Sequence, residues 1–166
     1  SNIDVGVLMP RIKNSDGSLQ FARKLLPSPL DIVIKRFFPK LLRTNIYEMR
    51  HLEPCHPVEI IALCGCFLFL RTDSLKSIGL FDTRYFMYFE DFDICRRIAS
   101  KYKAIYYPYS KVFHRANSEH RRNNKLFFYS IQSTLKYFNK WGYFDKSRNA
   151  LNTKTIEQVK KVSKGN

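Results

Sequence analysis

Residues Gly79 to Arg97 read GLFDTRYFMYFEDFDICRR and combine acidic with aromatic side chains. Four of the chain's 14 acidic residues fall in this short stretch: Asp82, Glu90, Asp91 and Asp93. Carboxylates held between aromatic rings lose part of their hydration, which disfavours the charged form and raises their proton affinity. Such groups are candidate general bases or metal ligands. Acidic residues also suit the positive end of a helix dipole, so we predict a helix over 91–100 with Glu90 and Asp91 at its N-terminus.

Length and composition favour one domain with a real core, because the chain has 166 residues and 45% of them are hydrophobic. The formal charge is +15, and residues 101–166 contain 15 Lys and Arg against three acids. A surface of this kind favours anionic partners, which include a membrane surface, phosphates and nucleic acid. The chain opens with Ser1 and Asn2 and enters an apolar run at once, which indicates a piece of a longer protein.

The longest apolar run is IIALCGCFLFL, from Ile60 to Leu70. Its 11 residues are too few to cross a bilayer and predict a buried strand. Cys64 and Cys66 lie inside this run, which indicates reduced cytosolic thiols rather than a disulfide framework. Gly65 between them predicts that another group approaches the backbone closely, and a substrate is one candidate.

Further strands are predicted at Val5–Met9 and Ala104–Phe113, the second interrupted at Pro108. Together with the run at 60–70 they form the predicted mixed sheet. A short helix is expected over 71–78, with Thr72 or Asp73 as its N-cap and Gly79 at its end. Beyond Asp145 the sequence is polar and basic, so residues 146–166 are expected to form a poorly packed tail behind a domain at 3–145.

Two predicted helices can be placed either in the core or at an interface. Leu30 to Phe38 mixes large apolar with basic residues, so it either packs on the core or contacts an anionic membrane surface. Asn124 to Trp141 ends before Gly142, a natural helix stop, and has the periodicity of a core helix or of an interfacial one. Its apolar residues at helical spacing are Phe127, Phe128, Ile131, Leu135 and Phe138.

His114 closes the last predicted strand and opens a basic loop. The four cations of this loop are Arg115, Arg121, Arg122 and Lys125. A histidine at this place is a candidate for holding a metal ion or a diphosphate, and an ordinary structural role is the alternative.

The order of these motifs resembles the second half of family 2 glycosyltransferases of the GT-A fold, especially the rhamnosyltransferase-like branch. Three motifs carry the resemblance: an apolar strand with Gly65 that ends in Arg71, the block SIGLFDTRYFMYFEDFDICRRI at 77–98, and a strand through Tyr107 and Pro108 to His114. Upstream, VGVLMPRI at 5–12 and DGSLQFARKLLPSP at 16–29 resemble a segment of the same enzymes. Smaller departures are Thr83 where Glu is usual, Leu80 where Gly is frequent and Cys66 where Ala is frequent.

The resemblance implies an α/β chain with a partial GT-A (nucleotide-diphospho-sugar transferase) fold, in which helices flank a mixed sheet. In that family the nucleotide-binding half, with its Asp-x-Asp metal motif, precedes the strand that opens this chain. Residues 1–80 contain no Asp-x-Asp, so the N-terminal nucleotide-binding half is expected to be missing. A sheet edge exposed in this way invites pairing, and we expect a homodimer through it.

For the complete enzyme, the resemblance implies inverting transfer of a sugar in cell-surface polysaccharide synthesis. The donor would be a nucleotide-diphosphate sugar, and the acceptor a glycan or a polyprenyl-diphosphate-linked molecule at the cytoplasmic face of the cell membrane. Asp91 would take the proton of the acceptor hydroxyl, and Glu90 would orient the acceptor or Asp91. The expected substrate-binding residues are Gly65, Tyr88, Asp93 and Arg97. A divalent ion, Mg or Mn, would neutralise the leaving diphosphate with help from His114, and the piece alone is expected to be inactive.

Two other classes of function stay open. A non-catalytic module for docking on a membrane or a partner, derived from a transferase, would explain the missing donor half. A nucleic-acid-binding domain would explain the charge together with ten Tyr and fourteen Phe, since aromatic stacking and cations bind single strands. Against nucleic acid, the acidic block would repel phosphate and no familiar RNA motif is present.

Overall fold

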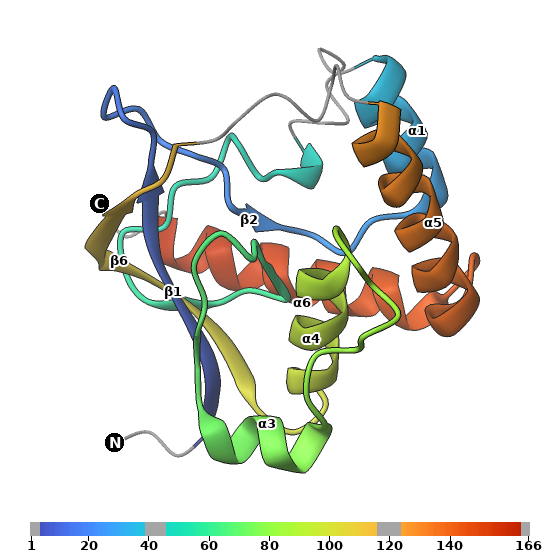
Figure 1. Cartoon of the computed structure of the whole chain (residues 1–166). Coiled ribbons are helices and arrows are strands. Elements are labelled where there is room, and N and C mark those ends of the chain that lie inside the picture. The colour runs from blue at the N-terminus through green and yellow to red at the C-terminus, as the bar shows by residue number, and fades with distance from the viewer. Residues whose placement is uncertain (1–3, 39–45, 116–123, 164–166) are drawn as a thin grey trace.

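The computed structural model describes residues 4–38, 46–115 and 124–163 (Figure 1). These residues form an α/β structure with a mixed sheet, a separate small sheet and flanking helices, as the sequence predicts. The strands are β1 (Val5–Lys13), β2 (Arg23–Lys24), β3 (Val58–Glu59), β4 (Ala62–Leu63), β5 (Phe69–Leu70) and β6 (Lys103–Phe113). The helices are α1 (Pro29–Phe37), α3 (Thr72–Ile78), α4 (Glu90–Ile98), α5 (Asn124–Trp141) and α6 (Lys146–Ser163).

The main sheet has the strand order β3-β6-β1-β5 and is built on a long parallel pair, β1 and β6. The short strands β3 and β5 flank this pair and run antiparallel to it. Pro10 lies opposite Tyr107, but the next residue of β1, Arg11, lies opposite Lys111. The register therefore skips residues 108–110, which agrees with the interruption predicted at Pro108, because proline has no N–H to give to a sheet.

The prediction of one strand over Ile60–Leu70 is wrong. Ala62 and Leu63 pair with β2 in the small sheet, residues 65–67 form a turn, and the chain returns to the main sheet only at Phe69. The apolar run is buried in its first part, but Cys64 and Cys66 are partly exposed. At this turn the Gly65 N–H bonds to the Asp91 side chain of α4 instead of to a neighbouring strand.

The helix predicted over 71–78 is confirmed as α3, but Arg71 stands at its N-cap in place of Thr72 or Asp73. The Arg71 guanidinium donates from Nε to the Val5 carbonyl at 2.8 Å, which joins the start of α3 to β1. The helix ends at Gly79, where φ is +85°, a backbone angle that favours glycine. The bounds of α5 agree with the prediction, and Gly142 follows it with φ of +90°.

Residues 146–163 form a packed helix, which differs from the poorly packed tail expected over 146–166. Thr155 and Val159 of α6 are buried. Asn152 donates to the Leu26 carbonyl at 2.9 Å and accepts from the Leu26 N–H at 2.8 Å. The helix is thus held by an amide that bonds to buried backbone, an anchor that a search for apolar residues does not find.

Candidate active site

The turn before α4 has an unusual backbone. Tyr88 and Phe89 both have φ of +67°, a left-handed conformation that only a few per cent of non-glycine residues adopt. The Phe89 ring is buried, and its centroid lies 5.6 Å from the ring of Phe92 and 5.1 Å from that of Tyr137. This aromatic packing stabilises two strained residues in a row. The turn directs the chain sharply into α4, so that Glu90 and Asp91 begin the helix as predicted.

The Asp91 carboxylate is fixed by two backbone N–H groups. Its Oδ2 accepts from the Gly65 N–H at 3.0 Å, and its Oδ1 accepts from the Phe92 N–H at 2.8 Å. A Cβ atom placed on Gly65 would lie only 3.3 Å from the Asp91 Cβ. The close approach predicted at Gly65 is therefore an approach to Asp91. Each carboxylate oxygen keeps a second lone pair, with which it can accept a proton.

Glu90 lies beside Asp91 in a different environment. A Cβ on Gly65 would be 3.7 Å from the Glu90 Oε1. The Glu90 Oε2 is buried and has no hydrogen-bond partner among the described residues. Burial, and to a smaller extent the negative charge of Asp91, raise the pKa of Glu90. The pair thus consists of one carboxylate that is firmly bonded and one that has a raised proton affinity and an unused oxygen.

A lysine and two thiols lie near this pair, and the position of the lysine was not predicted from the sequence. Burial by itself would lower the pKa of Lys24, but the negative charges of Cys64, Asp91 and Glu48 outweigh burial, so its pKa is raised. A hydrogen bond from the Cys66 thiol lowers the pKa of Cys64 and raises that of Cys66. Lys24 is far from Asp91 in the chain, so only the fold brings the cation to the acidic pair.

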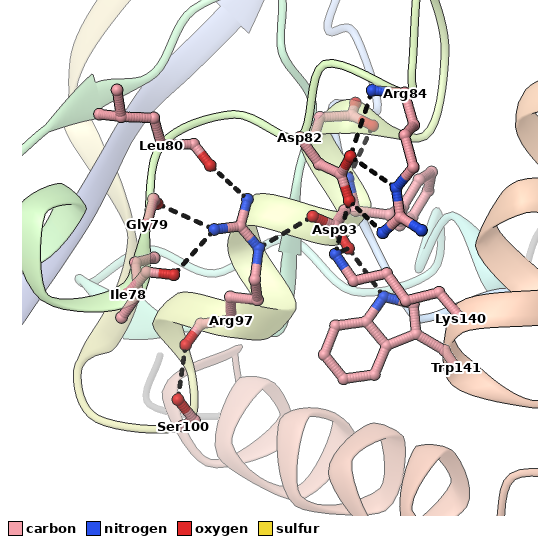
Figure 2. A network of polar contacts seen from close by, with 12 residues as sticks. Ile78, Gly79, Leu80, Asp82, Arg84, Asp93, Arg97, Ser100, Lys140 and Trp141 are labelled. Atoms are coloured by element: carbon pink, nitrogen blue, oxygen red, sulfur yellow. Dashed lines mark hydrogen bonds and ion pairs between the residues drawn. The ribbon is translucent and has the colours of Figure 1, made fainter.

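Asp93 belongs to an internal network (Figure 2). Its side chain is 0% exposed, and its Oδ2 accepts from the Arg97 Nε at 2.9 Å. Its Oδ1 accepts from the Lys140 Nζ at 2.7 Å and from the Trp141 Nε1 at 2.9 Å. Lys140 also reaches the Asp82 Oδ2 at 2.9 Å. Asp93 therefore has no surface for the substrate contact that the sequence suggested, because its oxygens join α4 to α5.

Arg97 is partly exposed, but its guanidinium is also held by bonds within the protein. Its remaining nitrogens donate to three backbone carbonyls, those of Ile78 at 3.0 Å, Gly79 at 2.8 Å and Leu80 at 2.8 Å. These bonds hold the loop after α3 against α4 (Figure 2). Arg97 could contact a substrate only if some of these hydrogen bonds were broken. Tyr88 is also partly exposed, and its pKa is raised by burial and then by the charge of Glu90.

His114 lies at the end of β6, where its Nδ1 is 3.1 Å from the Gln20 Oε1. The Gln20 amide also donates to the His114 carbonyl and to the Asn14 side chain. In 4–38, 46–115 and 124–163, no three His, Cys, Asp or Glu side chains gather into a set that could hold a metal ion. His114 is thus not part of a metal centre built from these residues. Arg121 and Arg122 of the predicted basic loop lie outside the described residues.

Comparisons with known proteins place the chain among relatives of sugar-transferring enzymes. Over 115 residues it is 33% identical to an N-acetylglucosaminyl-diphospho-decaprenol L-rhamnosyltransferase of Mycobacterium tuberculosis, found in two strains, with 66% of this chain and 37% of that protein covered. Over 100 residues it is 32% identical to rhamnosyltransferase WbbL of Escherichia coli, with 59% and 35% covered. No family model and no solved structure matches the chain.

The curated relatives that the chain matches are glycosyltransferases. More narrowly, the relatives are rhamnosyltransferases, so the resemblance predicted from the sequence is confirmed. The chain spans 37% of the length of the mycobacterial relatives that it matches. Among the helices that the structure describes, none is long and apolar enough to cross a membrane.

Proposed function

We propose that this chain is the acceptor-side part of an inverting family 2 glycosyltransferase of the GT-A fold. The donor is a nucleotide-diphosphate sugar of the rhamnose class, and the acceptor is a glycan on a polyprenyl diphosphate, used in cell-surface polysaccharide synthesis. The mycobacterial relatives are named for an acceptor of this kind, N-acetylglucosaminyl-diphospho-decaprenol. The observation that carries the proposal is the Asp91 carboxylate, fixed by the Gly65 N–H at the start of α4 in a chain related to rhamnosyltransferases.

In the proposed reaction Asp91 is the general base. An acceptor hydroxyl attacks the anomeric carbon of the donor sugar, and Asp91 takes the hydroxyl proton as the new C–O bond forms. The bond from that carbon to the diphosphate breaks and its electron pair leaves with the nucleoside diphosphate, so the configuration at the carbon inverts. The two backbone N–H groups on Asp91 prevent rotation of the carboxylate, which keeps a lone pair in one direction.

Glu90 and Tyr88 have supporting roles in this proposal. The Glu90 Oε2 has no partner among the described residues, so it can accept a hydrogen bond from a second hydroxyl of the acceptor and orient the sugar. Tyr88 offers a partly exposed ring at the same turn, on which a sugar face can stack. Asp93 and Arg97 support the site from within the protein instead of contacting the substrate.

The divalent ion, Mg or Mn, is part of the proposal for the complete enzyme, in which it would neutralise the leaving diphosphate. The described residues offer His114 alone for it, without a second and third ligand, so the steps above use only side chains and backbone groups of this chain. We place the reaction at the cytoplasmic face of the cell membrane, where the protein would be held peripherally.

The test uses the natural protein that contains these residues, incubated with nucleotide-diphosphate sugars and a polyprenyl-diphosphate-linked N-acetylglucosamine in detergent. Asp91→Asn keeps the shape of the side chain but removes its basicity, and we expect kcat to fall by roughly 10²–10⁴. The matched control is Asp73→Asn, an exposed acid of α3, which should leave kcat unchanged.

Three results discriminate between the readings. Turnover that collapses in Asp91→Asn and survives in Asp73→Asn supports the proposal. If the Asp91→Asn enzyme keeps its turnover, Asp91 is not the general base, but the protein is still a glycosyltransferase. No turnover and no donor binding with any sugar would favour the non-catalytic docking module.

A further inference from the structure

Helix α1 has large apolar residues on its solvent side, although Ile32 on its other side packs against the core. None of its residues, all of which the structure describes, is buried. Leu30, Val33 and Phe37 recur at i, i+3 and i+7 and are between 49% and 66% exposed. Lys35, which is partly exposed, pairs with Glu48, its Nζ lying 2.7 Å from the Glu48 Oε1. A surface helix of a water-soluble protein normally keeps its large apolar residues on the side that faces the core.

Helix α5 repeats this arrangement. Phe128, Ile131 and Leu135 again recur at i, i+3 and i+7, and they are between 41% and 58% exposed. The buried residues of the helix are Ser133, Tyr137 and Phe138. The helix therefore has two apolar sides, of which one packs on the core and the other faces solvent. The core packing predicted for this helix is therefore confirmed for one of its sides.

The two exposed stripes belong to neighbouring helices. Figure 1 shows α1 and α5 side by side, and the Arg36 guanidinium of α1 lies 4.6 Å from the centroid of the Phe127 ring of α5. We define the α1–α5 apolar face as Leu30, Val33, Phe37, Phe128, Ile131 and Leu135. Single exposed apolar residues are ordinary on protein surfaces, but six large ones on two adjoining helices indicate an interaction site.

The charge around this face indicates its partner. Of the five basic residues in the two helices, Lys35 pairs with Glu48 and Lys140 with Asp82 and Asp93. The other three are Arg36, Lys125 and Lys136, and the two helices contain one acid. The acid, Asp31, is used by the N-cap of α1, where it accepts from the Ser28 N–H at 2.8 Å. Large apolar side chains beside lysine and arginine suit an anionic bilayer, because the former enter the acyl boundary while the latter meet lipid phosphates.

We propose that the α1–α5 apolar face docks this protein onto an anionic lipid bilayer. This proposal rests on the proposed function, because a polyprenyl-diphosphate acceptor is held in a membrane and the enzyme must reach it there. Binding itself requires neither donor nor acceptor. Failure of docking and failure of transfer are therefore separate results.

The experiment is sedimentation of the 166-residue chain with vesicles of phosphatidylcholine alone, or of phosphatidylcholine and phosphatidylglycerol in equal parts. We expect binding to the anionic vesicles and much weaker binding to the neutral ones, with added salt weakening the former. The double variant Phe37→Ser/Phe128→Ser should bind anionic vesicles at least about tenfold more weakly, because two large side chains no longer leave water. Both positions are exposed, so the variant should stay folded, as circular dichroism can verify.

The matched control is Phe69→Ser on β5, which is 72% exposed but lies in the sheet instead of on these helices. It should bind like the wild type. Equal binding of the double variant and the wild type, or equal binding to neutral and anionic vesicles, would overturn the proposal. Light scattering that shows a wild-type dimer and a monomeric double variant, without a change in vesicle binding, would assign the face to a second copy and also overturn it.

Discussion

Substitution of Gly65 by alanine tests whether the position of Asp91 controls catalysis. The added Cβ would lie 3.3 Å from the Asp91 Cβ and 3.8 Å from its Oδ2. Gly65 does not have a positive φ, so alanine can adopt its backbone angles without strain. The N–H donor to Asp91 is also kept. The main effect of the substitution is therefore a displacement of Asp91, which we propose as the base.

The size of this displacement follows from the distance between the added Cβ and the Asp91 Cβ. A carbon–carbon contact of 3.3 Å is tighter than an ordinary contact, so Asp91 must move by a few tenths of an ångström. Since a misplacement of about 1 Å can cost roughly 10²-fold in rate, we expect kcat to fall roughly three- to tenfold. KM should change little, and the free energy of unfolding should change by no more than about 1 kcal/mol.

The assay is steady-state sugar transfer by the natural protein, with unfolding in urea measured beside it. The exposed Asp73→Asn variant again serves as the control, because it changes a side chain of α3 without adding an atom toward Asp91, and it should keep kcat near the wild-type value. A Gly65→Ala enzyme with unchanged kcat would refute the reasoning. So would a variant whose loss appears only in KM.

Three further substitutions test the surroundings of the site. Asp93→Asn removes a buried carboxylate to which Arg97, Lys140 and Trp141 all bond and should cost about 3 kcal/mol of unfolding free energy; a loss under about 1 kcal/mol in urea melts would contradict the network. Asn152→Ala should cost about 2 kcal/mol by stranding both backbone groups of Leu26, whereas the exposed Asn149→Ala on the same helix should cost almost nothing, and equal melts would show that α6 is not held this way. The pKa of Glu90 is raised by burial and by Asp91, so the stability contributed by its neutral form is complete below the ordinary pKa of Glu and is lost as pH rises through the folded value. Glu90→Gln should therefore be more stable than the wild type at neutral pH, by roughly 0.5 kcal/mol after allowance for its partial exposure, with the difference closing in acid; a constant difference across pH would assign it to packing.

Local pattern was sufficient where one segment determines its own structure. The period of the apolar residues located α5, and the acidic residues before a helical stretch located the start of α4 with Glu90 and Asp91. Gly65 was correctly identified as a place of close approach, although only the fold shows that the neighbour is Asp91. These features could be predicted because helix dipoles, periodicity and the absence of a side chain act within a few residues.

Contacts between distant segments set the limit of prediction. The run at 60–70 is apolar enough for a strand, but the chain turns at Gly65. The Gly65 N–H there bonds to the carboxylate of Asp91, which lies 26 residues further along the chain. Helix α6 has few apolar residues, and its anchor to Leu26 joins positions 126 residues apart. Asp93 was predicted to bind substrate because the sequence alone does not show that Lys140 of α5 pairs with it. That ion pair is visible only in the folded structure.

Lys140 and Trp141 at the end of α5 both bond to Asp93, so α5 connects its exposed apolar stripe to α4. Its C-terminal end is bonded to α4, which carries Asp91, while its exposed stripe begins 13 residues earlier at Phe128. At 1.5 Å per residue this separation corresponds to about 20 Å of helix. A bilayer that receives the stripe would thus lie at a fixed position relative to Asp91, because one continuous helix joins the docking side chains to the helix that carries the proposed base.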